Sequence, residues 1–520
     1  MSSAHGGSPL RGLMSTSRSE NFNGRFGRMF RNLRPATYGA TDNITRTNLM
    51  SLGTAMTSDP DAPKDGADDE ESGIPALYTY FGQFIDHDLT FDPNSSLQKA
   101  SDPDALIDYR TPAFDLDNVY GRGPNDQPYM YASDGKSFLL GDPIGGGSDP
   151  NAADLPRNNA TPRRALIGDP RNDENSIVSQ LQGLALRFHN RILADNPGMS
   201  FAQAQQQLRF HYQYVILTDF LPRIIDASVL AGLKDSAGHF DQHQLQFFRP
   251  RNSPFMPVEF SVACYRLGHS MVRPGYRLND NNLLPIFALG AAPDLRGFEA
   301  MDPGRAMDWG RMIDTDIRAY DGATGSDANT HRLQFAYRID TSLVNPLANL
   351  PASVASDPPP SLAQRNLIRA FELGLPSGQS VARAMHQPVI CDEQILIGKA
   401  IDNPQGTDVP TNIADLGKQL KTTAFVNNCP LWTYILAEAM QHKATVTIPV
   451  TGNVQVTTPR LGPVGGRIVA EVFLGLMFGD SASLLRTDPA WTPAEGAGYT
   501  LKDYVLYAIG KPAAKTAGAA

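Results

Sequence analysis

Apolar and polar positions follow a helical period along much of the chain. In residues 174–196 the apolar side chains recur every three or four positions, as expected for one face of a long amphipathic helix; they are Ile177, Leu181, Leu184, Phe188 and Ile192. A helical pattern also starts at Pro75. Similar spacing predicts helices over residues 201–226, 259–272, 361–374, 380–386 and 467–479.

Strand-like patterns are few and short. Residues 333–338 form one β-prone run, and residues 445–457 resemble a hairpin around Gly452. The acidic stretch 57–73, which contains Pro and Gly, is typical of a solvated loop. With no internal repeat or clear linker, the pattern predicts a mainly α fold in one large domain over 25–510, with mobile tails at 1–24 and 511–520.

Composition narrows the class of protein. Hydrophobic residues make up 41% and charged residues 19% of the 520 positions, which fits an ordinary globular chain. The net charge of -9 argues against nucleic acid as the main partner, because no excess of Lys and Arg can neutralise phosphates. Three cysteines form neither a disulfide framework nor a zinc motif: Cys264, Cys391 and Cys429.

The same sequence gives no sign of membrane insertion. The N-terminus lacks the apolar core of a secretory signal, and the apolar run 468–478 is interrupted by Glu471. We therefore expect a soluble protein, cytoplasmic by default, with export by a signal-independent route left open. The sequence does not indicate an oligomeric state.

The segment 78–92 concentrates polar groups in an apolar helix. Gln83, Asp86 and His87 share one helix face, whereas Asp88 lies about 100° further round. One interpretation is a solvent-exposed helix end, where charges cost little. The flanking apolar residues favour the other interpretation, a buried functional group, because buried polar side chains need partners or a purpose.

This segment resembles the distal helix of the animal haem peroxidases, in the peroxidase–cyclooxygenase superfamily, whose pattern is GQxxDHD. By that resemblance His87 is the distal acid/base and Gln83 its hydrogen-bonding neighbour. Asp86 corresponds to a carboxylate that becomes ester-linked to the haem, and Asp88 to a calcium ligand.

A second motif, TPAFDLDNVYG at 111–121, resembles the calcium loop of that family. It offers hard oxygen ligands, which suit Ca²⁺ because this ion accepts about six to eight of them in a flexible geometry. Taken alone, the two aspartates could equally form a solvated turn. Together with Asp88, the expected ligands are Thr111, the carbonyl of Ala113, Asp115 and Asp117.

A third motif, GDPRNDENS at 168–176, begins the long helix. Arg171 resembles the distal arginine and Glu174 the second ester-forming carboxylate. The acids in this motif could instead complement the positive end of the helix dipole, but that explanation does not account for Arg171.

The proximal side resembles the family at two further places. In CYRLGHSMVRPGYRLND, His269 corresponds to the haem-iron ligand and Arg266 precedes it. In QRNLIRAFELGLPS, Asn366 corresponds to the residue that accepts the Nδ1–H of that histidine, which fixes its ring. Arg369, one turn later, would suit a haem propionate.

The resemblance spans roughly residues 25–480 and implies a haem peroxidase. Its cofactors would be haem b, ester-linked through Asp86 and Glu174, and Ca²⁺. It would reduce hydrogen peroxide, with His87 as base and then acid and Arg171 stabilising charge, and oxidise small donors through a ferryl intermediate. Asn175 stands where chloride-oxidising members carry methionine, so we expect turnover of iodide, thiocyanate, bromide and phenols, but poor use of chloride.

Two alternatives remain. A fatty-acid dioxygenase or cyclooxygenase of the same superfamily would carry a radical-forming tyrosine three residues before the proximal histidine. Here that position is Arg266, and Tyr265 would lie about 100° away on a helix. The other alternative is a calcium-stabilised binding module that has lost catalysis.

Overall fold

The computed structural model describes residues 24–90, 107–108, 110–250, 254–288, 290, 292–321 and 329–511. Except for Gly24 and Lys511, the predicted tails lie outside these residues. The described part is mainly helical, as predicted. Its α-helices are α1 Asp42–Ala55, α2 Leu77–Leu89, α3 Asp117–Tyr120, α4 Ser176–Asp195, α5 Phe201–Val215, α6 Leu221–Ile224, α7 Ala227–Ala231, α8 Leu362–Glu372, α9 Gly378–Ala384, α10 Ile413–Gln419, α11 Leu431–Ala439, α12 Gly465–Gly479, α13 Leu484–Thr487 and α14 Leu501–Ala508.

The strands are short and form small sheets. They are β1 Gly24–Gly27, β2 Glu71–Pro75, β3 Ile107–Asp108, β4 Met256–Pro257, β5 Gly275–Asn279, β6 Asn282–Pro285, β7 Arg318–Ala319, β8 Phe335–Tyr337, β9 Leu396–Ile397, β10 Thr411–Asn412, β11 Lys443–Thr447, β12 Val450–Thr451 and β13 Gln455–Pro459. β11 pairs antiparallel with β13, from Lys443 opposite Pro459 to Thr447 opposite Gln455. The predicted hairpin is therefore confirmed, with Gly452 in the connection at a φ of 99°.

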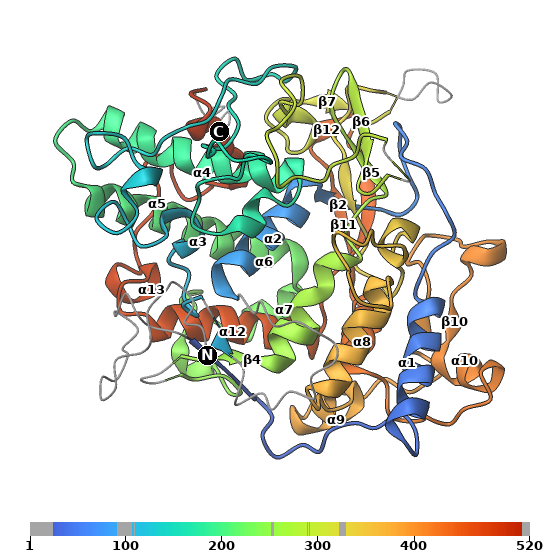
Figure 1. Cartoon of the computed structure of the whole chain (residues 1–520). Helices are drawn as coiled ribbons and strands as arrows, with labels where there is room; N and C mark the ends of the chain where they lie inside the picture. The colour runs from blue at the N-terminus through green and yellow to red at the C-terminus, as the bar shows by residue number, and fades with distance from the viewer. Residues whose placement is uncertain are drawn as a thin grey trace.

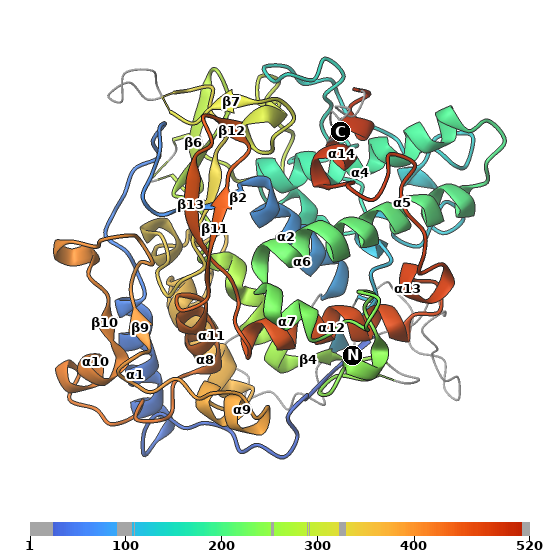
Figure 2. The same cartoon turned by 180° about the vertical axis from the view of Figure 1, so that it is seen from behind.

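Helix α2 runs through the middle of the molecule. Figures 1 and 2 show it between α4 and α5 on one side and the strands β2, β11 and β13 on the other. Ten of its thirteen residues are buried, His87 and Asp88 among them, whereas Gly82, Gln83 and Asp86 are partly exposed. The helix thus carries the segment 78–89 into the core.

Helix α4 confirms the clearest sequence pattern. Asn175 caps it, since the Asn175 side chain accepts hydrogen bonds from the backbone N–H groups of Ile177 and Val178. Beyond it, the predicted helix 201–226 consists of α5, a π-helical turn over Ile216–Phe220, and α6.

The predicted helix over 259–272 is helical over 259–269, but it is not a regular α-helix. The chain forms a π-helical turn over Glu259–Ala263 and then a 3-10 helix over Cys264–His269. Nearly every side chain from 259 to 267 is buried, so no amphipathic face sets a regular period. This irregular segment is the one that ends at His269.

The predicted loop 57–73 is also wrong at its end. Residues 71–73 belong to β2, which pairs with β8. Glu71 is 1% exposed and forms ion pairs of 2.5 Å with Arg273 and Arg332. These distant arginines, which no local pattern reveals, make the burial of this acid tolerable.

Several helices were not predicted, α11 and α1 among them. α11 is buried on all sides and therefore lacks an amphipathic pattern. α1 packs on α8 through Gly53, which is buried in the contact.

No helix in the described ranges is long and apolar enough to cross a membrane.

The Gly53 contact yields a stability prediction. A Cβ at position 53 would lie 2.9 Å from the backbone nitrogen of Gln364 and 3.0 Å from its Cα. Gly53→Ala should therefore lower the free energy of unfolding by about 1–3 kcal/mol, although Ala is the better helix former. Urea unfolding measures the change. Thr47→Ala, at an exposed position of α1, is the matched control and should change stability little.

Candidate active site

A cavity of about 1070 Å³ lies against the end of α2 and the segment that carries His269. Six residues that the sequence analysis singled out line its wall, although they come from three separate parts of the chain. They are Gln83, Asp86, His87, Glu174, Arg266 and His269. The two histidines therefore face one common space.

His87 is held in one orientation by a chain of amides. Its Nδ1 lies 2.7 Å from Oδ1 of Asn172, and Nδ2 of Asn172 donates to Oε1 of Gln182 over 2.8 Å. Because Oδ1 can only accept, the proton of a neutral His87 ring sits on Nδ1. Nε2 is left as the ring nitrogen with a lone pair.

Burial and the neighbouring positive charge of Arg171 lower the pKa of His87 to about 3. The ring is therefore neutral near pH 7, as a proton acceptor must be. His87 is 4% and Asp88 0% exposed, so interpreting this segment as a solvent-exposed helix end is wrong. The sequence motifs did not indicate Asn172 or Gln182 as partners of His87. The position of Asn172 next to Arg171 is the one sequence feature that could have indicated its role.

His269 lies at the end of the 3-10 helix, and its Nδ1 is 2.8 Å from Nδ2 of Asn366 on α8. The predicted pair is thus in contact, but its donor and acceptor roles are reversed. Oδ1 of Asn366 accepts from Nη1 of Arg266 over 3.3 Å, which turns the amide so that Nδ2 faces the histidine. Burial, with a contribution from Arg266, lowers the pKa of His269 to about 3, so this ring is also neutral.

Two carboxyl groups share the cavity wall with the histidines. Nε2 of Gln83 donates to Glu174, and Oε1 of Gln83 accepts from Asn175 over 3.2 Å. Asp86 accepts from the hydroxyl of Thr90 over 3.2 Å. Burial raises the pKa of Asp86, and it raises that of Glu174 to about 7, so Glu174 is partly protonated at neutral pH.

The two remaining arginines lie behind the cavity wall. The guanidinium of Arg171 contacts Asp169 at 2.7 Å and donates to the backbone carbonyls of His87 at 3.2 Å and Thr90 at 2.5 Å. It therefore braces the last turn of α2, where carbonyl groups lack helical partners. Arg369 is buried on α8, and neither arginine is among the residues that line the cavity.

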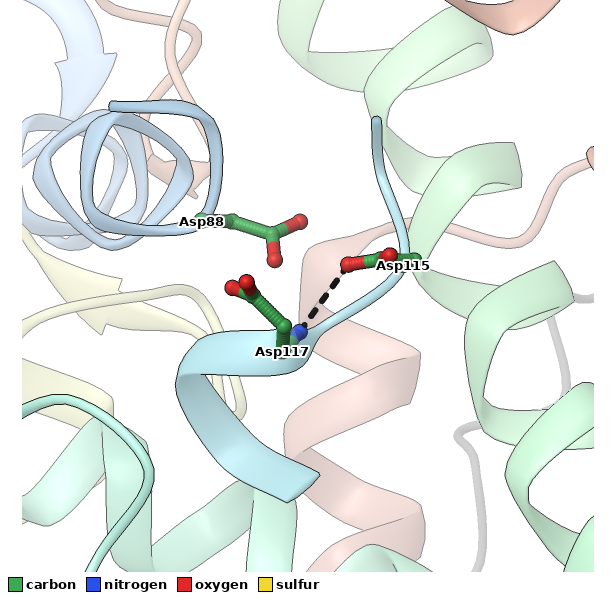
Figure 3. A group of neighbouring side chains, drawn as sticks. All are labelled: Asp88, Asp115 and Asp117. Atoms are coloured by element: carbon green, nitrogen blue, oxygen red, sulfur yellow. Dashed lines mark hydrogen bonds between the residues drawn. The ribbon is translucent and has the colours of Figure 1, made fainter. Parts of the chain in front are cut away.

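Behind α2 three carboxyl groups converge. Figure 3 shows Asp88 at the end of α2 turned toward Asp115 and Asp117, which belong to the loop before α3 and its first residue. One oxygen of each lies within 4.8 Å of the others. Both oxygens of Asp88 are buried and have no hydrogen-bond partner among the described residues.

The rest of that loop is arranged around the carboxylates. The hydroxyl of Thr111 donates to Asp115 over 2.8 Å, and Nη1 of Arg110 lies 3.4 Å from Asp117. Burial and the charges of Asp115 and Asp117 raise the pKa of Asp88 well above its usual range. Ala113 is in the same turn, its N–H bonded to the carbonyl of Thr111. A divalent cation would relieve this repulsion.

Comparison with known proteins finds sequence similarity over part of the chain. Residues 96–289 match the family model of the animal haem peroxidases. Thyroid peroxidase of Sus scrofa is 29% identical over 125 residues, which are 22% of this chain and only 12% of that protein.

Three solved structures share the fold. Peroxidase A of Dictyostelium discoideum has a TM-score of 0.57 at 15% identity, covering 94% of this chain and 93% of that one. The fatty acid alpha-dioxygenase of Arabidopsis thaliana has a TM-score of 0.54 at 16% identity, covering 91% and 76%. That of Oryza sativa has a TM-score of 0.51 at 15% identity, covering 92% and 78%.

Part of the sequence, residues 96–289, is thus similar to the animal haem peroxidases, and the described chain shares the fold of a peroxidase and of two fatty acid alpha-dioxygenases.

The raised pKa of Glu174 predicts a pH-dependent stability in the haem-free protein. An unfolded chain releases this proton near pH 4.5, whereas the folded chain keeps it up to about pH 7. The contribution of Glu174 to stability is therefore full below pH 4.5 and is lost as the pH rises through 7. Glu174→Gln should raise the melting temperature more at pH 8 than at pH 5.

Thermal unfolding of both proteins at the two pH values measures this difference. Glu299→Gln, which changes an exposed carboxylate of the same cavity, is the control. An equal shift at both pH values would contradict the assigned protonation of Glu174.

Proposed function

We propose that this protein is a haem peroxidase that reduces hydrogen peroxide and oxidises small donors such as iodide, thiocyanate, bromide and phenols. The observation that carries the proposal is that His87 and His269 line one cavity, each neutral and each supported from behind through Nδ1. Neutral imidazoles at such positions suit an acid/base on one side and a metal ligand on the other.

The residues present fit a haem group. His269 would hold the haem iron through Nε2, and the haem would supply the redox chemistry of peroxide reduction and donor oxidation. Rotation of the Asn366 amide by 180° would let Oδ1 accept the Nδ1–H of His269, as second-shell partners of metal-bound histidines do. Arg266, which lines the cavity, would contact a haem carboxylate. Arg369 stays a predicted second partner of such a carboxylate.

On the opposite side His87 performs the proton transfers. Its Nε2 accepts a proton from hydrogen peroxide and returns it to the departing oxygen, which leaves as water. Asn172 keeps the tautomer that this requires. Arg171 holds the backbone of His87 in place and lends a fixed positive charge to the site; its predicted contact with the peroxide would require it to turn from Asp169.

Replacing the two histidines separately tests this function. His269→Ala should abolish the bound-haem Soret band. His87→Ala should keep the haem, while its reaction with peroxide slows by about 10²–10⁴-fold, the usual contribution of a positioned base. Stopped-flow absorption with stoichiometric peroxide measures both. His239→Ala, at a site 78% exposed, is the control; a colourless wild-type protein after expression with ample haem would refute the proposal.

Asp86 and Glu174 would attach the haem covalently. Both acids lie at the cavity wall. Each ester would join a carboxyl oxygen to a haem methyl carbon, with the loss of one hydrogen from each partner and the reduction of one hydrogen peroxide to two water molecules. Gln83 contacts Glu174 and would orient it. After turnover with peroxide, acidified butanone should leave haem on the wild type but extract it from the doubly substituted Asp86→Asn, Glu174→Gln protein. Complete extraction from the wild type would disprove the linkage.

The cluster of Asp88, Asp115 and Asp117 would bind Ca²⁺. Three carboxylates and the Thr111 hydroxyl are hard oxygen donors, and the unpartnered oxygens of buried Asp88 fit a cation. The carbonyl of Ala113 is the further predicted ligand. Since Asp88 follows His87 directly, the ion would anchor the end of α2 that holds the base.

Chelation tests this site. Removal of Ca²⁺ should lower the melting temperature, and its return should restore it, because a ligand that binds only the folded state stabilises by about 2.7 kcal/mol at 100 times its Kd. Asp88→Asn should remove the response to Ca²⁺. Asp59→Asn, at an exposed position, is the control. Indifference of the wild type to chelator and to added Ca²⁺ would exclude a calcium site.

One observation favours a second candidate, a fatty-acid dioxygenase. Because the proximal segment is not an α-helix, the 100° separation expected for Tyr265 does not apply, and this tyrosine lines the cavity. Its hydroxyl donates to the carbonyl of Gly82 over 3.1 Å, which favours the peroxidase. Oxygen uptake on adding a polyunsaturated fatty acid, lost in Tyr265→Phe, would support the dioxygenase instead.

A further inference from the structure

The outer part of the cavity carries an aromatic residue in a strained position. Phe298 lines the cavity, is 39% exposed, and has a φ of 61°. A bulky residue in this left-handed region is an outlier, because Cβ approaches the backbone. Leu116 has a similar φ of 58°, but it is fully buried in the core. Phe298 has no comparable burial.

The backbone around Phe298 is clamped onto the segment that carries Glu174. The N–H of Gly297 donates to the carbonyl of Glu174 over 2.9 Å, and the N–H of Phe298 donates to that of Asp173 over 2.6 Å. A Cβ at position 297 would lie 2.0 Å from the Asp173 oxygen, so only glycine allows this approach. Arg164 donates to the carbonyl of Phe298 over 2.7 Å.

These contacts fix the backbone from which the ring projects. The Cα of Phe298 is therefore held in one position relative to the segment that carries Glu174. An exposed aromatic side chain on its own needs no explanation. Here, however, a glycine or asparagine would relieve the backbone strain, and such strain at a cavity points to function.

Apolar side chains of another segment line the same cavity. Val354 is 51% exposed, and the buried Leu347 and Leu350 line the cavity with it. A hydrogen bond of 3.4 Å from Arg296 to Ser353 joins this segment to the one that carries Phe298. Apolar side chains that line a cavity mark a place where apolar surface of a ligand is removed from water. An inorganic anion such as iodide gains nothing from such a wall, whereas a flat aromatic ring does.

We propose that Phe298 and the apolar wall beside it form a binding subsite for the ring of an aromatic electron donor of the phenol class. This inference rests on the proposed peroxidase function. Each phenol loses one electron and its hydroxyl proton, and one hydrogen peroxide and two phenols give two phenoxyl radicals and two water molecules. The O–O bond breaks, and the peroxide oxygens receive the two electrons and two protons.

Donor kinetics of the haem-loaded enzyme test the subsite. Phe298→Ala and Phe298→Gly should raise KM for a simple phenol about two- to tenfold, the range expected for a lost ring–ring contact. Phe298→Tyr should keep the wild-type KM. With iodide as donor, kcat/KM should stay within about twofold for all three, a split that general damage to the site would not produce. Tyr129→Ala, an aromatic residue 52% exposed outside the cavity, is the control.

A binding measurement separates this inference from the proposed function. Saturation-transfer NMR without peroxide, with benzamide as a non-oxidised probe, should detect the ring on the wild type and on Phe298→Tyr but not on Phe298→Ala. This holds even if the protein fails to react with peroxide, in which case only the peroxidase proposal falls. Equal probe binding by Phe298→Ala, or an equal loss of phenol and iodide turnover, would overturn the role of Phe298.

Discussion

The structure depends on the burial of polar side chains along α2. His87 and Asp88 are buried on one apolar helix beside the partly exposed Gln83 and Asp86, and leaving a buried neutral polar group unpartnered costs on the order of 1–3 kcal/mol. Neighbouring residues supply partners to all of these side chains except Asp88, whose oxygens have no hydrogen-bond partner among the described residues. Asn172 contacts His87, Asn175 contacts Gln83, and Arg171 binds the carbonyls at the end of the helix. The site is therefore assembled by the same contacts that make the burial tolerable.

The short segment before α4 provides most of the contacts that hold this site together. Within residues 169–175 it provides a carboxylate that fixes Arg171, an amide for His87, the acid Glu174, and the cap of α4. It also accepts the clamp from Gly297 and Phe298 through its backbone carbonyls. One stretch of chain thus joins the distal base, the cavity wall and the cavity's outer part, so displacement of this segment would affect all three.

The proximal side is built differently. His269 stands at the end of a π-helical and 3-10 segment rather than on a regular helix, and such irregular turns are frequent at functional sites. The irregularity brings Tyr265 and Arg266 to the same cavity as His269. Trp432 of α11 packs edge-on to the His269 ring, at 6.5 Å between centroids, and donates to the carbonyl of Arg266 over 3.3 Å. His269 and Arg266 therefore contact α11, a helix that the hydrophobic pattern of the sequence did not predict.

The sequence alone predicted helices such as α4 and α8, the hairpin at 445–457, and the residue types that meet at the site, because these depend on local period and on motifs of adjacent residues. It could not determine the burial of Glu71, the irregular turns before His269, or the amide partners Asn172 and Gln182. Those depend on which distant groups lie opposite. The orientation of the Asn366 amide and the position of the Arg171 guanidinium also depend on the tertiary structure. Asn366 Oδ1 accepts from Arg266, and Arg171 pairs with Asp169, because buried donors and acceptors pair with the groups that lie nearest to them.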